Sequence, residues 1–251
     1  MRRHELLEQL HDRLAPRTYL EIGVSTGTSM SLSRTRSIGV DPFFRIRREL
    51  RCDLQLVRAT SDEFFASAGA FEHFGGSAFD LAFIDGMHLA EYALRDFINT
   101  ERHAHPASVI VLDDMLPRVP VEGLRDRRDA RSHGAWAGDV YKILDALRTL
   151  RPDLVCLELD TGPTGTVAIF LPDSSSTMLV VAYDELVQAY VVPDPQDIPD
   201  EVLRRSRALD PEDLLRSSIW DGLRRLRERP AAEARPEVAR LLAEAGLATP
   251  R

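Results

Sequence analysis

Short, continuously apolar runs recur along the first two thirds of the chain, separated by stretches whose apolar positions follow a helical period. Strands buried on both faces of a parallel sheet are typically apolar throughout. We therefore predict strands at residues 19–22, 37–40, 54–57, 79–84, 108–112, 154–159 and 166–171. The stretches between them predict helices at residues 3–15, 28–33, 43–50, 61–67, 89–102 and 139–150. This alternation predicts an α/β fold, with a doubly wound, mostly parallel seven-stranded sheet and helices on both sides.

The last two apolar runs are joined only by Asp160-Thr-Gly-Pro-Thr-Gly165. A crossover between parallel strands needs a dozen residues or more, so a connection this short predicts a hairpin. We therefore expect the sheet to end in an antiparallel pair.

Two segments depart from this rhythm. Residues 117–138 are rich in Arg, Asp, Gly and Pro and follow the fifth strand directly. A loop of this length in a compact domain is usually a lid or a binding loop. Helical patterns then dominate at residues 184–190, 199–208, 211–228 and 236–245. We expect a main domain over residues 1–174 and a helical extension over 175–251, which either packs on the core or forms a homodimer interface.

Composition narrows the class of protein. The formal net charge is −8 and the acidic residues are spread along the chain, whereas a general nucleic-acid binder needs a basic patch. No run approaches the roughly 18 apolar residues of a membrane span, and the first residues lack the apolar stretch of a signal peptide. Cys52 and Cys156 have no CxxC partner, so we expect reduced thiols. These features predict a cytoplasmic protein that acts on a small molecule, without a nucleic-acid or membrane partner.

The first predicted strand ends in an E-x-G-x-x-x-G turn, formed by Glu21, Gly23, Ser25 and Gly27 with the residues between them. Glycines let the backbone approach a ligand closely, and the start of the following helix offers free N–H groups. The second strand ends in Asp41, fourteen positions after Gly27, where α/β nucleotide binders hold ribose hydroxyls. A helix N-cap is the structural alternative for Asp41. Together these features predict a site for a ribose-bearing cofactor.

The details of the turn separate two cofactors. The dinucleotide fingerprint is G-x-G-x-x-G, but Val24 and Ser25 follow the first glycine here. A pyrophosphate needs the close approach that the second glycine gives, so NAD is disfavoured. S-adenosylmethionine has no phosphate and suits this turn better. Ser61 and Asp62 follow the third strand, where adenine is often contacted, although an N-cap role explains Ser61 equally well.

Three carboxylates follow two further strands. Asp85 ends the fourth strand, Asp113 and Asp114 end the fifth, and His88 lies three residues after Asp85. The carboxyl ends of neighbouring parallel strands line one crevice, so we expect these acids to converge. Crowded anions repel unless a cation joins them or a proton is taken up. Oxygen ligands of this kind suit Mg²⁺. The structural alternatives are helix caps and arginine partners for the acids, and a cap on the 89–102 helix for His88.

These motifs together resemble a known family. The turn at residues 21–27, Gly39-Val-Asp41, Phe79–His88 and Val111–Asp114 are similar to the class I S-adenosylmethionine-dependent methyltransferases. The most similar branch contains bacterial sugar and natural-product O-methyltransferases, akin to macrolide-sugar methyltransferases and, more distantly, catechol O-methyltransferases. The resemblance covers about residues 17–171.

The resemblance implies roles for four residues. Asp85, Asp113 and Asp114 match the positions that bind Mg²⁺ in the metal-dependent members, and His88 matches the general base. Asp85 also borders the cofactor. No large segment precedes the first strand, so the lid is expected from residues 117–138 or from the C-terminal helices. Trp136, which closes that loop, either contacts the substrate or anchors the lid.

The leading hypothesis is an Mg²⁺-dependent O-methyltransferase for a small polyhydroxylated or catechol-like molecule, such as a sugar within a natural product. One alternative keeps the fold and cofactor but leaves His88 to act as base without a metal. A second is a non-catalytic S-adenosylmethionine-binding protein, and an NAD-dependent enzyme is the least favoured.

Overall fold

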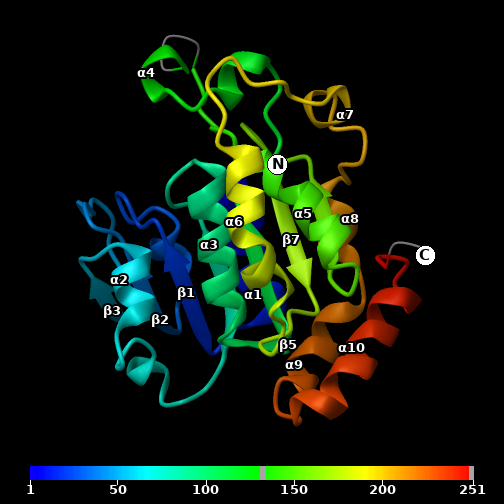
Figure 1. Ribbon diagram of the computed structural model, residues 1–251. Coiled ribbons are helices and arrows are strands. Elements are labelled where there is room, and N and C mark those ends of the chain that lie inside the picture. The colour runs from blue at the N-terminus through cyan, green and yellow to red at the C-terminus, as the bar shows by residue number, and fades with distance from the viewer. Residues whose placement is uncertain (131–133, 249–251) are drawn as a thin grey trace.

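The computed structural model describes residues 1–130 and 134–248, and its centre is a seven-stranded sheet (Figure 1). The strand order is β3-β2-β1-β4-β5-β7-β6. The strands are β1 (Thr18–Ile22), β2 (Arg36–Val40), β3 (Asp53–Val57), β4 (Phe79–Ile84), β5 (Ala104–Leu112), β6 (Val155–Leu159) and β7 (Thr166–Phe170). Each predicted strand is present, and the predicted α/β fold is confirmed.

The sheet is parallel except at one edge. Strands β1 to β5 pair in parallel, while β7 runs antiparallel to both β5 and β6. The predicted hairpin of β6 and β7 is therefore confirmed. The order reverses at β1, whose neighbours are β2 and β4, and a crevice at such a switch point is where α/β sheets bind ligands.

Helices cover both faces of the sheet (Figure 1). One face carries α2 (Ser61–Ala66), α3 (Ala90–Glu101), α5 (Ile143–Leu150) and α6 (Met178–Tyr190). The other carries α1 (Arg3–Leu14), α8 (Pro211–Arg216), α9 (Ile219–Leu226) and α10 (Ala231–Glu244). A short α7 (Asp200–Leu203) lies between them in sequence. Successive strand residues point to opposite faces, so the apolar strands feed two separate cores. Among the described helices, none combines the length and apolar character needed to cross a membrane.

The helix predicted at residues 43–50 is wrong. This segment is irregular, and Arg45 and Arg47 donate backbone hydrogen bonds to the carbonyls of Ser25 and Thr26. Its partly buried Phe44 and Ile46 are two positions apart, which is an extended rather than a helical period. The segment therefore runs alongside the glycine turn instead of forming a separate helix.

The helix predicted at residues 28–33 is reduced to one 3₁₀ turn, η1 (Met30–Leu32). Serine hydroxyls explain this, because they offer the backbone other hydrogen bonds. The Ser31 hydroxyl donates to the carbonyl of Thr28, and the Ser29 hydroxyl donates to Glu21.

The helices after residue 175 divide between the two faces. Helix α6 packs on α3 and α5, while α9 and α10 pack on β5 from the opposite side. The continuous pattern at 211–228 is broken into α8 and α9 around Ser217 and Ser218. The boundary between a main domain and an extension at residue 174 remains a prediction.

Candidate functional site

Gly23 follows β1 at a point where the chain leaving β4 passes so close that a side chain would not fit. Its φ of 93° lies in the left-handed region, and an added Cβ would lie 1.9 Å from the carbonyl oxygen of Asp85. The absence of a side chain at Gly23 thus allows the end of β4 to pack against the end of β1. This contact fixes the backbone that carries Asp85.

Asp41 follows β2 and organises the turn after β1. Its two carboxylate oxygens accept hydrogen bonds from the backbone N–H groups of Ser25 (2.7 Å) and Phe43 (2.6 Å). Gly27, at the end of the turn, packs against Ile46: a Cβ added to Gly27 would lie 3.1 Å from Ile46 Cδ1. Each oxygen of Asp41 keeps acceptor capacity, and the residue is half-buried. Asp41 and the turn therefore fit a ribose with its hydroxyls as donors.

Glu21 lies in the interior. Its side chain is buried and accepts hydrogen bonds from the hydroxyls of Tyr19 (2.7 Å) and Ser29 (2.6 Å). Burial raises the pKa of Glu21 to about 8, and the two hydroxyl donors only partly oppose this. A carboxyl with these partners ties η1 to β1, and its role toward a cofactor remains a prediction.

Ser61 and Asp62 already have partners in the chain. Thr60, and not Ser61, caps α2, since its hydroxyl accepts from the N–H of Glu63. Ser61 hydrogen-bonds to the buried Asp96. Asp62 accepts two hydrogen bonds of 2.6 Å from Arg95. The N-cap explanation for Ser61 is therefore wrong, while adenine contact by Ser61 and Asp62 remains a prediction.

The three predicted acids do converge. Ile84 pairs with Leu112 across β4 and β5, which places Asp85 beside Asp113 and Asp114. Asp114 has a φ of 60°, unusual for a residue with a side chain, and its carboxylate accepts a hydrogen bond from Thr164 on the β6–β7 turn. We call Asp85, His88, Asp113 and Asp114 the carboxylate cluster.

His88 bridges two of these carboxylates. Its Nε2 lies 3.3 Å from Asp85 Oδ1 and its Nδ1 lies 3.0 Å from Asp114 Oδ2. The ring stacks on Trp136, with centroids 4.7 Å apart, and Nδ1 lies 2.9 Å from the carbonyl of Trp136. Burial lowers the pKa of His88, but the hydrogen bond to Asp85 and the charges of Asp114 and Asp85 outweigh it and raise the pKa to about 9.

Asp139 lies after Trp136 in the loop that follows β5. It caps the start of α3, which is the structural role that the sequence left open for His88. Its carboxylate accepts a 2.9 Å hydrogen bond from the N–H of Ala90 at the start of α3, and it also binds Arg125 and Lys142. Gly138 lets the loop pass His88, because an added Cβ would lie 1.7 Å from the His88 carbonyl oxygen. Trp136 thus anchors the loop over the imidazole ring.

The acids of the carboxylate cluster are buried beside one another. Asp113 and Asp114 are buried, and Oδ2 of each faces a charged group, Arg3 at 2.7 Å for Asp113 and His88 at 3.0 Å for Asp114. Burial raises the pKa of both, and neighbouring carboxylates raise it further. Asp85, His88 and Asp114 each offer one ligand atom, all within 4.8 Å of one another. The predicted ligand Asp113 is not part of this group, and two carboxylates with an imidazole fit a divalent cation.

The structure adds Arg3, which sequence reasoning missed. Its Nη1 lies 2.7 Å from Asp113 Oδ2 and 3.7 Å from Asp114 Oδ1, and its Nη2 lies 3.8 Å from Asp85 Oδ2. The N-terminus lies at the end of the sheet where α4 (Arg127–Ala130) lies (Figure 1). No sequence signal links an arginine at the start of a helix to acids more than 80 positions away.

Little space is left within the cluster. The cavity lined by Asp85, His88, Asp113 and Asp114 has a volume of about 20 Å³, enough for about one water or ion. A substrate therefore needs some movement of the surrounding side chains.

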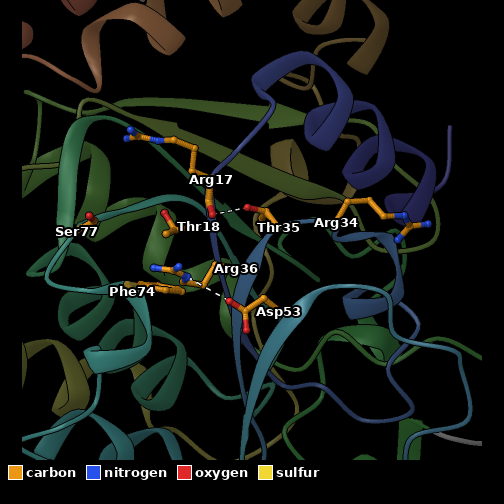
Figure 2. A pocket seen from close by; sticks show the side chains of 8 residues that line it. All are labelled: Arg17, Thr18, Arg34, Thr35, Arg36, Asp53, Phe74 and Ser77. Atoms are coloured by element: carbon orange, nitrogen blue, oxygen red, sulfur yellow. Dashed lines mark hydrogen bonds and ion pairs between the residues drawn. The ribbon is translucent and has the colours of Figure 1, made fainter.

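A larger cavity, of about 430 Å³, lies at the amino ends of β1 to β3, away from the cluster (Figure 2). Its arginines already have partners: Arg17 pairs with Asp80 and Arg36 pairs with Asp53. The side chain of Arg34 points away from the other two (Figure 2) and donates to nearby backbone carbonyls. The three charges do not converge, so this cavity is not a built anion site.

Comparison with known families identifies the type of domain that carries this site. Residues 20–115, somewhat less than half of the chain, match the family model described as a methyltransferase domain. Residues 20–115 form a methyltransferase domain. The matched range begins in β1 and ends just after Asp114, so it contains the glycine turn, Asp41 and the whole carboxylate cluster. The predicted methyltransferase domain, with its Rossmann-like methyltransferase fold, is confirmed.

Several solved structures are similar to the methyltransferase domain and its surroundings. They include an S-adenosylhomocysteine-bound methyltransferase from Podospora anserina (16% identity, TM-score 0.48, covering 67% of this chain and 77% of that one). An O-methyltransferase from Bacillus cereus, also in complex with S-adenosylhomocysteine, has 17% identity and a TM-score of 0.44, with coverage of 67% and 80%. The O-methyltransferase TomG from Streptomyces achromogenes has 16% identity and a TM-score of 0.45, with coverage of 68% and 79%. No curated protein matches the chain.

Proposed function

We propose that the protein is an S-adenosylmethionine-dependent, Mg²⁺-dependent O-methyltransferase that acts on a hydroxyl of a small polyhydroxylated molecule, such as a sugar or a catechol-like natural product. The observation that carries the proposal is the carboxylate cluster, with its buried Asp113 and Asp114, inside a methyltransferase domain. We place the enzyme in the cytoplasm, with no nucleic-acid or membrane partner, and leave a homodimer as a further prediction.

The cofactor is proposed to lie at the ends of β1 and β2. S-adenosylmethionine supplies the methyl group there. Asp41 would accept hydrogen bonds from the ribose hydroxyls, and Gly23, Ser25 and Gly27 shape the turn that borders the methionine part. Asp85 lies next to this turn because its carbonyl packs on Gly23, which joins the cofactor side to the cluster.

The carboxylate cluster would bind the metal and the acceptor. Asp85, Asp113 and Asp114 are proposed to hold Mg²⁺, which supplies positive charge that lowers the pKa of a neighbouring hydroxyl. His88 is the proposed proton acceptor. Nε2 would take the hydroxyl proton once a bound cation offset the charges of Asp85 and Asp114, which raise the pKa of His88. Trp136 holds the imidazole plane by stacking on it.

Arg3 supports a second candidate, in which methyl transfer needs no metal. Its guanidinium already brings one positive charge to the three carboxylates. In that case His88 would act alone as the base, chelation would leave the rate unchanged, and the rate would rise with pH toward 9 because the pKa of His88 is about 9.

Two measurements separate the candidates. Isothermal titration with S-adenosylmethionine tests cofactor binding, and absence of binding rules out both enzymes. Methyl transfer is then followed with a panel of sugars and catechols, with EDTA and after adding back Mg²⁺. Loss of turnover with EDTA and recovery with Mg²⁺ supports the leading proposal, whereas an unchanged rate supports the metal-independent one.

A further inference from the structure

Arg3 meets each of the three proposed metal ligands. Its guanidinium lies against one oxygen of Asp85, one of Asp113 and one of Asp114, at 3.8, 2.7 and 3.7 Å. His88 faces the other oxygens of Asp85 and Asp114. The guanidinium therefore lies where the three carboxylates converge, which is the place that a shared cation would take.

The backbone below Arg3 is fixed, while its side chain can leave. Helix α1 buries four leucines of its apolar face, Leu6, Leu7, Leu10 and Leu14. The N–H of Arg3 donates to the carbonyl of Gly162, and the N–H of Gly162 donates to the carbonyl of Met1. The Arg3 side chain is 26% exposed, whereas that of Asp113 is 1% exposed. The Arg3 guanidinium thus reaches the cluster from the solvent side and can move back toward solvent.

Arg3 makes its shortest contact with Asp113, where Nη1 lies 2.7 Å from Oδ2. Burial lowers the pKa of Arg3, but the charge and hydrogen bond of Asp113 help to raise it. The contacts with Asp85 and Asp114 are longer, at 3.8 and 3.7 Å, and are contacts of charge only. Arginine usually binds carboxylates through aligned, paired N–H groups. A divalent ion in place of the guanidinium would bring twice its charge to the three carboxylates.

We propose that Arg3 is a built-in counter-cation of the carboxylate cluster that competes with the divalent metal and must withdraw before metal and substrate enter. This inference rests on the proposed metal-dependent function. Removal of the Arg3 charge should therefore raise the affinity for the metal. If Arg3 were only a surface residue, its removal would leave that affinity unchanged.

The test is the affinity of the full chain for Mn²⁺, measured by isothermal titration for the wild type, Arg3→Met and Arg2→Met. Methionine keeps an unbranched apolar stem and removes the charge. Arg2 is the matched control, because it is exposed and adjacent but makes no ion pair with the cluster among the described contacts. We expect Arg3→Met to bind Mn²⁺ at least about tenfold more tightly, or about 1.4 kcal/mol, and Arg2→Met to stay within about twofold.

The outcomes separate this inference from the proposed function. Tighter binding by Arg3→Met alone supports competition. An unchanged or weaker affinity, with clear binding by the wild type, overturns the inference and leaves the metal site intact. Absence of Mn²⁺ binding in all three proteins overturns both.

A second readout does not depend on the folding of Arg3→Met. The ¹⁵N resonance of the Arg3 guanidinium in the wild type, assigned by its absence in Arg3→Lys, is followed as Mg²⁺ is added. Withdrawal predicts a shift that saturates with the metal. A resonance that stays constant while the metal binds overturns the inference.

Discussion

The two ends of the candidate site treat their acids differently. On the cofactor side, Glu21 and Asp41 are satisfied by donors of the chain itself, two hydroxyls in one case and two backbone N–H groups in the other. In the carboxylate cluster, Asp113 and Asp114 face each other's charge and are paired with the charged groups of Arg3 and His88. Acids that neutral donors hold shape a turn, whereas acids that are crowded together depend on nearby cations. The balance of charge, rather than the number of acids, distinguishes the two.

The largest expected effect comes from removing one acid of the carboxylate cluster. Asp114→Asn should abolish turnover, with a loss of at least about 10³-fold, and abolish Mn²⁺ binding, because one charge and one ligand oxygen are lost. S-adenosylmethionine affinity should change by less than about threefold, since Asp114 lies on the other side of Asp85. Steady-state kinetics and titration calorimetry measure both. Asp53→Asn, at an exposed acid paired with Arg36 at the amino end of β3, is the control. Equal losses of turnover and Mn²⁺ binding in the two variants would show that the acids of the carboxylate cluster have no special role.

His88 tests whether the cluster carries the chemistry. His88→Ala should lower kcat by about 10²–10⁴-fold if the imidazole accepts the proton, while Mn²⁺ still binds. The pH profile of kcat should lose one ionisation at the same time. A fall in kcat below about threefold would remove His88 from the proton transfer and leave it as a partner of Trp136.

Gly23 joins the two ends, and its replacement should disturb both. Gly23→Ala meets the Asp85 carbonyl as well as an unfavourable φ, so we expect a loss of about 3 kcal/mol or more in the free energy of unfolding. Gly76→Ala also has a positive φ, of 80°, but nothing within 4 Å of an added Cβ. Its cost should be about 1 kcal/mol. Urea unfolding measures each, and similar values would show that the contact with Asp85 is unimportant.

The smallest effect concerns Glu21 and pH. Its folded-state pKa of about 8 is above the ordinary value of 4.5, so its contribution to stability is complete below about pH 4.5 and is lost as the pH rises through 8. Glu21→Gln should remove this slope, and the melting temperature of the wild type relative to the variant should fall between pH 5 and pH 9. If the difference in melting temperature stayed constant over this range, the pKa of Glu21 would not be raised by folding.

The strands and the convergence of the acids were predictable because they depend on local patterns. Continuous apolar runs mark buried strands, and acids at the ends of neighbouring parallel strands must meet. Residues 43–50 were misassigned because Phe44 and Ile46 alternate within a run of arginines, where the helical and extended periods are hard to distinguish. Arg3 could not be predicted, because an ion pair between the first helix and the ends of β4 and β5 leaves no spacing in the sequence. The burial of Glu21 depends in the same way on distant packing.

The most direct test of the central claim is a crystal soaked with Mn²⁺ and S-adenosylhomocysteine, with the ion located by its anomalous scattering. We expect one ion bound by Asp85, Asp113 and Asp114, with the guanidinium of Arg3 withdrawn and the cofactor beside Gly23 and Asp41. A soaked crystal in which Arg3 still lies among the three carboxylates and no ion is bound there would contradict the claim.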